Sequence, residues 1–129
     1  MKLLLDTHIW LWSLREPDRL GRRVQRELKS ASNELWLSPI SVWEAVLLHR
    51  KGRLQLHVDL SAWLLRATAR MREAPLTWEI AFLAPQLALQ HQDPADRFLA
   101  ATAKLFDLAL VTADERLLAF SDIKTLPNN

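Results

Sequence analysis

The chain contains no cysteine, and only two of its 129 residues are glycine. Without cysteine there is no disulfide framework and no nucleophilic thiol. The absence of cysteine also fits a reducing compartment. Gly21 and Gly52 stand too far apart to form a glycine-rich phosphate-binding loop. These absences exclude several common kinds of site, and they leave carboxylates as the main chemistry-bearing groups.

The chain also lacks any uncharged apolar run approaching ~18 residues, so no membrane-spanning helix is expected. The apolar N-terminal run meets Asp6 before the hydrophobic region of a signal peptide can form. Half of the residues are hydrophobic, which for a chain of this length is enough for one core. We therefore expect a soluble, cytoplasmic protein in which residues 1–129 form a single domain.

Charge is distributed unevenly although the net charge is only +2. Residues 1–72 carry 13 Lys and Arg against 7 Asp and Glu, whereas residues 73–129 carry 4 against 8. A basic surface for a polyanion beside an acidic pocket would give this pattern. Charges scattered over solvated faces explain it equally well.

Short apolar runs alternate with helical patterns along the chain. Strands are predicted over residues 2–6, 34–38, 74–77, 108–112 and 124–126. Helices are predicted over residues 7–15, 20–30, 41–52, 59–72, 78–91, 93–106 and 113–120. This alternation favours a three-layer α/β fold with a mainly parallel central sheet.

Four acidic residues fall where a strand ends or the next helix begins. Asp6 ends the first strand, and Glu44 lies in the first turn of the helix after the second. Asp96 lies in the first turn of the 93–106 helix, and Asp114 follows the 108–112 strand by two residues. Strand ends and the following helix starts share one edge of a parallel sheet, so these carboxylates are expected to converge.

Converging carboxylates would raise one another's pKa unless a cation neutralised them. An all-oxygen ligand set favours Mg²⁺ or Mn²⁺ over zinc. Such a site suits the hydrolysis of phosphodiester bonds.

Most of these acids also have a purely structural explanation as helix caps. The explanation covers the capping-box spacing of Ser41 and Glu44, the DPAD segment 93–96 and the TADE segment 112–115. Asp6 could likewise cap the helix that follows it. His8, beside Asp6, is a candidate for contacting a substrate or moving a proton, and a packed or solvated histidine explains it as well.

Four segments resemble the PIN-domain ribonucleases and, more narrowly, the VapC-type toxins of bacterial toxin–antitoxin pairs. They are LLLDTHIWLW (3–12), LSPISVWEAVLLHRKGRL (37–54), DPADRFLAATA (93–103) and LVTADERL (110–117). Each motif is weak alone, but together they follow the family's order over essentially the whole chain.

The resemblance implies a PIN fold and a Mg²⁺- or Mn²⁺-dependent endoribonuclease. The family's catalytic and metal-binding acids then fall on Asp6, Glu44, Asp96 and Asp114. Asp93 competes with Asp96 for the third position, and we assign it instead as the N-cap. Thr112 matches a small hydroxyl residue found near the fourth acid.

The resemblance further implies an RNA substrate, a small VapB-like antitoxin that covers the active site, homodimers and larger toxin–antitoxin assemblies. The apolar helix segment 9–14 is a candidate partner surface, unless it is simply buried in the monomer. Basic residues that could follow RNA phosphates are Arg15, Arg19, Arg22, Arg23 and Arg26.

Two other classes of protein remain open. One is a catalytically silent PIN-like module that binds RNA or a partner, and the presence of all four acids counts against it. The other is a receiver domain with an acidic pocket. That class requires paired acids after the first strand, where this chain has Thr7 and His8 after Asp6.

Overall fold

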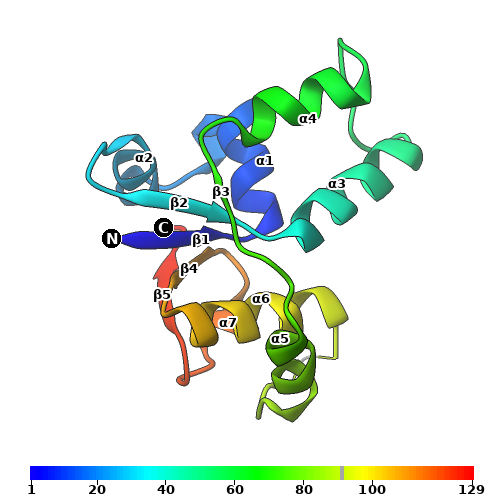
Figure 1. Ribbon diagram of the computed structural model, residues 1–129. Helices are drawn as coiled ribbons and strands as arrows, with labels where there is room; N and C mark the ends of the chain where they lie inside the picture. The colour runs from blue at the N-terminus through cyan, green and yellow to red at the C-terminus, as the bar shows by residue number, and fades with distance from the viewer. Residues whose placement is uncertain (91) are drawn as a thin grey trace.

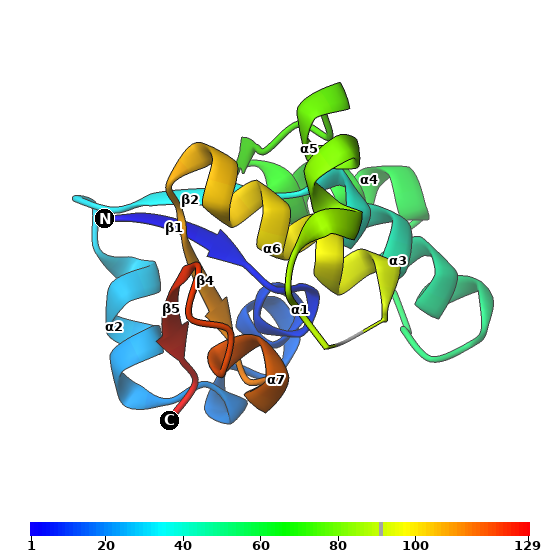
Figure 2. The same ribbon diagram turned by 90° about the horizontal axis from the view of Figure 1, so that it is seen from below.

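The computed structural model describes residues 1–90 and 92–129, and within them five strands form one sheet. The strands are β1 (Lys2–Leu5), β2 (Glu34–Leu37), β3 (Arg72–Glu73), β4 (Ala109–Thr112) and β5 (Lys124–Pro127). Their order across the sheet is β3-β2-β1-β4-β5, and every neighbouring pair is parallel. The prediction of an α/β fold with a mainly parallel sheet is confirmed (Figures 1 and 2).

Helices and 3₁₀ turns join the strands in chain order. They are α1 (Thr7–Arg15), η1 (Pro17–Arg19), α2 (Arg22–Lys29), α3 (Pro39–Arg50), α4 (Leu60–Thr68), α5 (Trp78–Leu83), η2 (Ala84–Gln86), α6 (Pro94–Phe106) and α7 (Glu115–Leu118). Helices α1 to α4 pack on one face of the sheet, and α5 to α7 contribute to the core on the other. Figure 1 shows these two layers above and below the strands.

The two central strands explain why the sheet is covered on both sides. In β1, Leu4 contacts the core cluster beneath α5 and α6, whereas Leu3 and Leu5 belong to the opposite cluster. In β4, Leu110 and Val111 divide between the two clusters in the same way. Successive side chains of a strand point to opposite faces, so an uninterrupted apolar run supplies both cores.

The helix segment proposed as a partner surface is largely buried within the monomer. Ile9, Trp10 and Leu11 belong to the core, and the Trp10 Nε1–H donates to the Ala67 carbonyl oxygen at 3.0 Å. Of this segment only Leu14 remains among the well-exposed apolar side chains. The prediction of a partner surface along residues 9–14 is therefore wrong for its first half.

Three predicted elements differ from the structure around β3. The strand predicted over 74–77 is instead Arg72–Glu73, and Thr77 caps helix α5 by accepting a hydrogen bond from Ile80 N. The helix predicted over 59–72 ends at Thr68. The helix predicted over 78–91 ends at Leu83 and gives way to η2, because a proline at position 85 has no N–H to continue the helix. Residue 91 lies outside the described residues.

None of the helices in the described ranges is long and apolar enough to cross a membrane. The longest of them, α6, has 13 residues.

Candidate active site

Asp6 lies at the carboxyl edge of the sheet, where β1 ends and α1 begins. Its backbone N–H donates to the Val111 carbonyl oxygen of β4 at 3.0 Å. Its side chain caps α1, with Oδ1 accepting from Thr7 N at 2.8 Å. Oδ2 accepts from the hydroxyl of Thr112 at 2.6 Å. One carboxylate oxygen is thus held by the first residue of α1 and the other by the last residue of β4.

Thr112 is fully buried at the end of β4 and connects Asp6 to the segment that carries Asp114. While its hydroxyl donates to Asp6, the same oxygen accepts from Asp114 N at 3.0 Å. Its carbonyl oxygen accepts from Asn128 N at 3.1 Å. A single side chain therefore fixes the relative positions of two of the four acids.

Thr112 is not the N-cap of the following helix. That cap is Asp114, whose Oδ1 accepts from Arg116 N at 2.9 Å and lies 3.6 Å from Arg116 Nε. The capping explanation thus holds for Asp114 itself, and it does not remove this acid from the edge of the sheet.

Glu44 occupies a different helical position from the one predicted. Helix α3 begins at Pro39, and Ser38 is the N-cap whose hydroxyl accepts from Ile40 N at 3.1 Å. Glu44 therefore lies in the second turn, and the capping-box interpretation of Ser41 and Glu44 is wrong. The serine three positions before the predicted cap, which proline follows, is the stronger start signal.

The side chain of Glu44 points to Thr7 at the start of α1. The Thr7 hydroxyl donates to Glu44 Oε1 at 2.5 Å, and the buried Ser41 Oγ lies 2.8 Å from the same Thr7 oxygen. Because Thr7 N also donates to Asp6, this one residue links the acids of β1 and α3. The sequence analysis missed this role of Thr7, although a threonine directly after the acid is a usable signal.

The third acidic segment opens helix α6, which packs beside α3 (Figure 2). Asp93 is the N-cap, with Oδ1 accepting from Ala95 N at 2.9 Å, as predicted. Asp96 is half-buried in the first turn of the helix. Its placement at the start of α6 agrees with the prediction.

Burial and neighbouring charges act together on Asp6. Burial raises its pKa, and the hydrogen bonds from Thr112 and Thr7 oppose that rise. The charge of His8 lowers this pKa, and the charge of Asp114 raises it.

Glu44 is in a similar environment. Burial raises its pKa, the hydrogen bond from Thr7 opposes the rise, and the charges of Asp6 and Asp93 add to it. His8 acts in the opposite direction on this carboxylate too. The structure thus couples Asp6 electrostatically to Glu44 and Asp114, with His8 near both Asp6 and Glu44.

The donor set of this edge consists of carboxylate and hydroxyl oxygens, the ligands that hard divalent cations prefer. Across residues 1–90 and 92–129, no three His, Asp or Glu side chains are grouped closely enough to hold a metal ion as they stand. Burial raises the pKa of Asp6 and of Glu44 because it disfavours their charged forms. A cation bound nearby would stabilise those charged forms. The residue types and their charge fit such an ion, but the prediction that all four acids converge is not met by their positions in the described residues.

Arg97 is a further residue of this region that the sequence analysis missed. Its guanidinium donates to three backbone carbonyl oxygens, those of Ala84 at 3.0 Å, Leu87 at 3.2 Å and Leu89 at 2.6 Å. A basic residue near a helix start opposes the helix dipole, which is the signal for such a partner. Arg97 thereby fastens η2 and the residues after it to the helix turn that carries Asp96.

The fold and this edge define a parallel α/β protein with an acidic site at the carboxyl ends of its strands. The PIN domain family model matches residues 3–124, and the chain belongs to the PIN domain family. The resemblance that the four sequence motifs indicated is confirmed.

Named relatives agree with this family. The chain is 34% identical over 116 residues to Ribonuclease VapC22 of Mycobacterium tuberculosis, covering 89% of this chain and 88% of that protein. It superimposes with a TM-score of 0.76 on VapBC2 from Rickettsia felis bound to a promoter DNA fragment, at 16% identity over the whole of both chains. The TM-score is 0.69 with FitAcB from Neisseria gonorrhoeae, at 25% identity over 98% of this chain and 97% of that one.

Proposed function

We propose that this protein is an endoribonuclease toxin that hydrolyses RNA phosphodiester bonds at the carboxyl edge of its sheet and is neutralised by a cognate antitoxin. The observation that carries the proposal is the connection of Asp6 and Glu44 through Thr7, which holds two desolvated carboxylates at one edge. The 34% identity to a protein named a ribonuclease supports RNA as the substrate. The family model over residues 3–124 supports one PIN domain across residues 1–129.

We assign Asp6, Glu44, Asp96 and Asp114 as the residues that hold a Mg²⁺ or Mn²⁺ ion. When bound, the ion would supply positive charge to the scissile phosphate and lower the pKa of an attacking water. The protein's own groups prepare this edge. Thr7 and Thr112 fix carboxylate oxygens of Glu44 and Asp6, and Arg97 fastens the 84–89 segment to the first turn of α6.

A catalytically silent RNA-binding module is the second candidate. It has no need for buried carboxylates whose hydrogen-bond donors are themselves buried, as Thr7 and Thr112 are. A carboxylate kept partly desolvated costs folding free energy, so its retention favours a catalytic site.

The function is tested by incubating antitoxin-free protein with total cellular RNA in Mg²⁺, in Mn²⁺ and in EDTA, beside the Asp96→Asn variant. We expect discrete cleavage products in either metal, none in EDTA, and a loss of about 10²-fold or more in rate for the variant. Cleavage that continues in EDTA, or at the wild-type rate without the Asp96 carboxylate, would contradict the assignment. A folded wild-type protein that cuts no RNA would favour the binding module.

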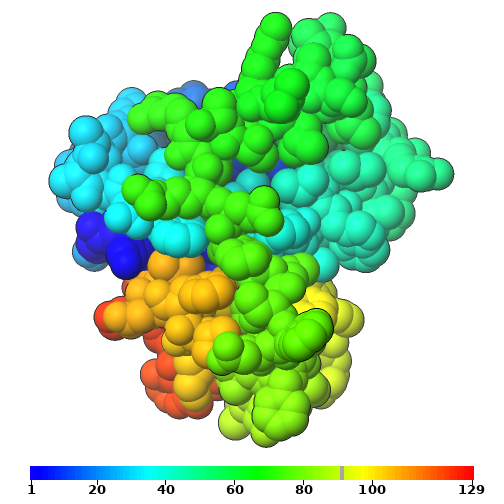
Figure 3. Space-filling view, viewed as in Figure 1, coloured from blue at the N-terminus to red at the C-terminus, as the bar shows by residue number. Residues whose placement is uncertain are grey.

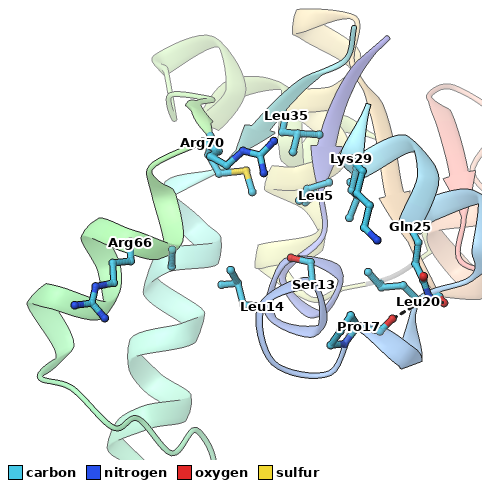
Figure 4. A pocket seen from close by; sticks show the side chains of 13 residues that line it. Leu5, Ser13, Leu14, Pro17, Leu20, Gln25, Lys29, Leu35, Arg66 and Arg70 are labelled. Atoms are coloured by element: carbon cyan, nitrogen blue, oxygen red, sulfur yellow. Dashed lines mark hydrogen bonds between the residues drawn. The ribbon is translucent and has the colours of Figure 1, made fainter. Parts of the chain in front are cut away.

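An antitoxin surface is available on the helical face away from α5. A pocket of about 280 Å³ lies between α1, α2 and α4, and apolar side chains including Leu14, Leu20 and Met71 line it (Figure 4). Lys29, Arg66 and Arg70 add positive charge to the same pocket. A partner segment with apolar side chains and acidic neighbours would fit this surface, and structural neighbours described as toxin–antitoxin complexes support such a partner.

We also propose that the toxin forms a homodimer through helix α5. Trp78 and Phe82 are 95% and 74% exposed and lie one turn apart on this helix. The segment that forms α5 lies on the face of the molecule seen in Figure 3. Single exposed apolar residues are common, but two large aromatic side chains in one stripe mark an interaction surface.

Light scattering after size exclusion tests the homodimer. We expect a dimer for the wild type and a monomer for the Trp78→Ser/Phe82→Ser variant. The two substitutions remove the apolar surface whose burial drives the association. Trp43→Ser, which removes another exposed tryptophan from α3, should leave the dimer intact. Equal masses for the wild type and the double variant would place any interface elsewhere.

A further inference from the structure

Three side chains form a row on the surface that starts at the acidic site. His8 lies in the first turn of α1, next to Thr7, which contacts both Asp6 and Glu44. The His8 and Trp12 ring centroids are 5.9 Å apart, and the rings are tilted by 57°. The guanidinium carbon of Arg19 lies over the Trp12 ring, 4.2 Å from its centroid.

The row presents charged and aromatic surface to solvent while its base is fixed. The His8 side chain is exposed, and the Arg19 side chain keeps 55% of its surface accessible. Trp12 is half-buried and packs against the core cluster of α1 and α2. The Trp12 ring, fixed by this packing, can receive a stacking ligand without being ordered first.

The backbone at Arg19 is held by the C-terminal residues. Asn128 Nδ2 donates to the Arg19 carbonyl oxygen at 3.1 Å, and Gly21 N donates to Asn128 Oδ1 at 2.7 Å. The backbone of Asn129 approaches Gly21 so closely that a Cβ at position 21 would lie 2.1 Å from the Asn129 backbone oxygen. The backbone position of Arg19 is therefore set by contacts with residues distant in sequence.

We propose that His8, Trp12 and Arg19 form a subsite for an unpaired nucleotide of RNA next to the bond that is cleaved. The inference rests on the proposed function, since it extends the same site along the substrate strand. Exposed ring and guanidinium surface stacks on an unpaired base, and the Arg19 charge pairs with the backbone phosphate. The row begins at His8, the residue after Thr7, so a strand lying on it leads toward the edge that carries Asp6 and Glu44.

Arg19 is able to turn to a phosphate because its ion pair within the protein is weak. Its Nη1 lies 3.5 Å from Glu16 Oε2, and both side chains are more than half exposed. An exposed pair of this kind contributes little to stability, so exchange of the carboxylate for a phosphate costs little.

The chain contains a matched control at the opposite edge of the sheet. Arg72 lies over the Trp36 ring at 5.9 Å and pairs with Glu34 Oε1 at 3.7 Å, much as Arg19 does with Trp12 and Glu16. Arg72 belongs to the edge strand β3, whereas Asn128, the partner of Arg19, follows the other edge strand β5. Arg72→Gln therefore removes the same charge from the same kind of pair away from the row.

The experiment measures binding of a fluorescein-labelled single-stranded RNA 12-mer of mixed sequence by anisotropy, in EDTA to prevent cleavage. The variants are Trp12→Leu, Arg19→Gln and Arg72→Gln, each with its thermal midpoint recorded. We expect about tenfold weaker binding for Trp12→Leu and for Arg19→Gln, the size of one base–aromatic stack, and less than twofold for Arg72→Gln. In Mn²⁺ the first two variants should raise KM and keep kcat, because neither residue touches the reacting phosphate.

A duplex of the same sequence provides a further check, because its bases are paired and cannot stack on the row. Trp12→Leu should leave duplex binding unchanged. If the wild type cleaves RNA through Asp6 while Trp12→Leu and Arg19→Gln bind and cleave like it, the subsite is overturned and the proposed function stands. If these variants weaken antitoxin binding but not RNA binding, the row is a protein surface and the inference fails. If the folded wild type neither binds nor cleaves RNA, the inference and the proposed function fail together.

Discussion

Replacement of Asp6 by Asn should reduce metal-dependent RNA cleavage by about 10³-fold while the protein stays folded. The amide retains an oxygen for the hydrogen bond from Thr7 N and can donate its N–H to the Thr112 oxygen, so the contacts at the end of β1 persist. Burial raises the pKa of the Asp6 carboxyl, which means that folding favours its neutral form. A neutral amide therefore removes a folding cost, and the thermal midpoint in EDTA should not fall.

The matched control for this variant is Asp107→Asn. Asp107 ends helix α6 with a φ of 54°, a left-handed conformation that asparagine tolerates well. Its carboxylate pairs with Lys124 at 2.9 Å on the exposed surface, so the change should cost less than about 1 kcal/mol. The cleavage rate of Asp107→Asn should equal that of the wild type. A comparable loss of cleavage in Asp6→Asn and Asp107→Asn would contradict a specific role of Asp6.

Replacement of Thr112 by Val should affect stability and activity together. Valine has nearly the shape of threonine but removes the hydroxyl that donates to Asp6 and accepts from Asp114 N. Because the Thr112 side chain is fully buried, both partners lose a hydrogen bond inside the protein. We expect the free energy of unfolding to fall by about 1–3 kcal/mol. The cleavage rate should fall by about 10-fold or more, because two acids lose their common contact.

Thr102→Val separates this effect from the general cost of removing a buried hydroxyl. Thr102 is also fully buried, and its hydroxyl donates at 2.6 Å to the Phe98 carbonyl oxygen of its own helix. Loss of this hydrogen bond should lower the free energy of unfolding by less than about 1 kcal/mol, since the Phe98 carbonyl lies in a regular helix. RNA cleavage should be unchanged. Denaturant unfolding and cleavage rates check both variants, and equal losses at positions 102 and 112 would contradict the bridging role.

The strands and helices with strong local signals were predictable from the sequence. The run KLLL and the helix from Thr7 to Arg15 have the predicted bounds to within a residue, and so does α6 with its Asp93 cap. A buried apolar run, a cap followed by proline and a helical apolar stripe are all local features. They do not depend on residues distant in sequence.

The elements that the sequence misplaced depend on long-range contacts or on competing local signals. Strand β3 has only two residues, and pairing with Trp36 and Leu37 of β2 defines it. At α3 two start signals compete, and Ser38 with Pro39 prevails over Ser41.

The roles of Thr7 and Arg97 also depend on distant partners. The Thr7 hydroxyl contacts Glu44, 37 positions away, and Arg97 binds the 84–89 segment. The periodicity of apolar residues along the sequence does not indicate contacts between residues so far apart. The positions of Asp6 and Asp114 at the carboxyl edge of the sheet were predictable, because parallel strands end at one edge.

Calorimetric titration of Mn²⁺ into the antitoxin-free protein tests most directly the claim that Asp6 belongs to a metal-binding site at the sheet edge. We expect saturable binding to the wild type and to Asp107→Asn, and binding at least tenfold weaker to Asp6→Asn. Mn²⁺ should also raise the thermal midpoint of the first two proteins and not of the third, because an ion that binds the folded state stabilises it. Equal affinity of the wild type and Asp6→Asn for Mn²⁺ would contradict the account.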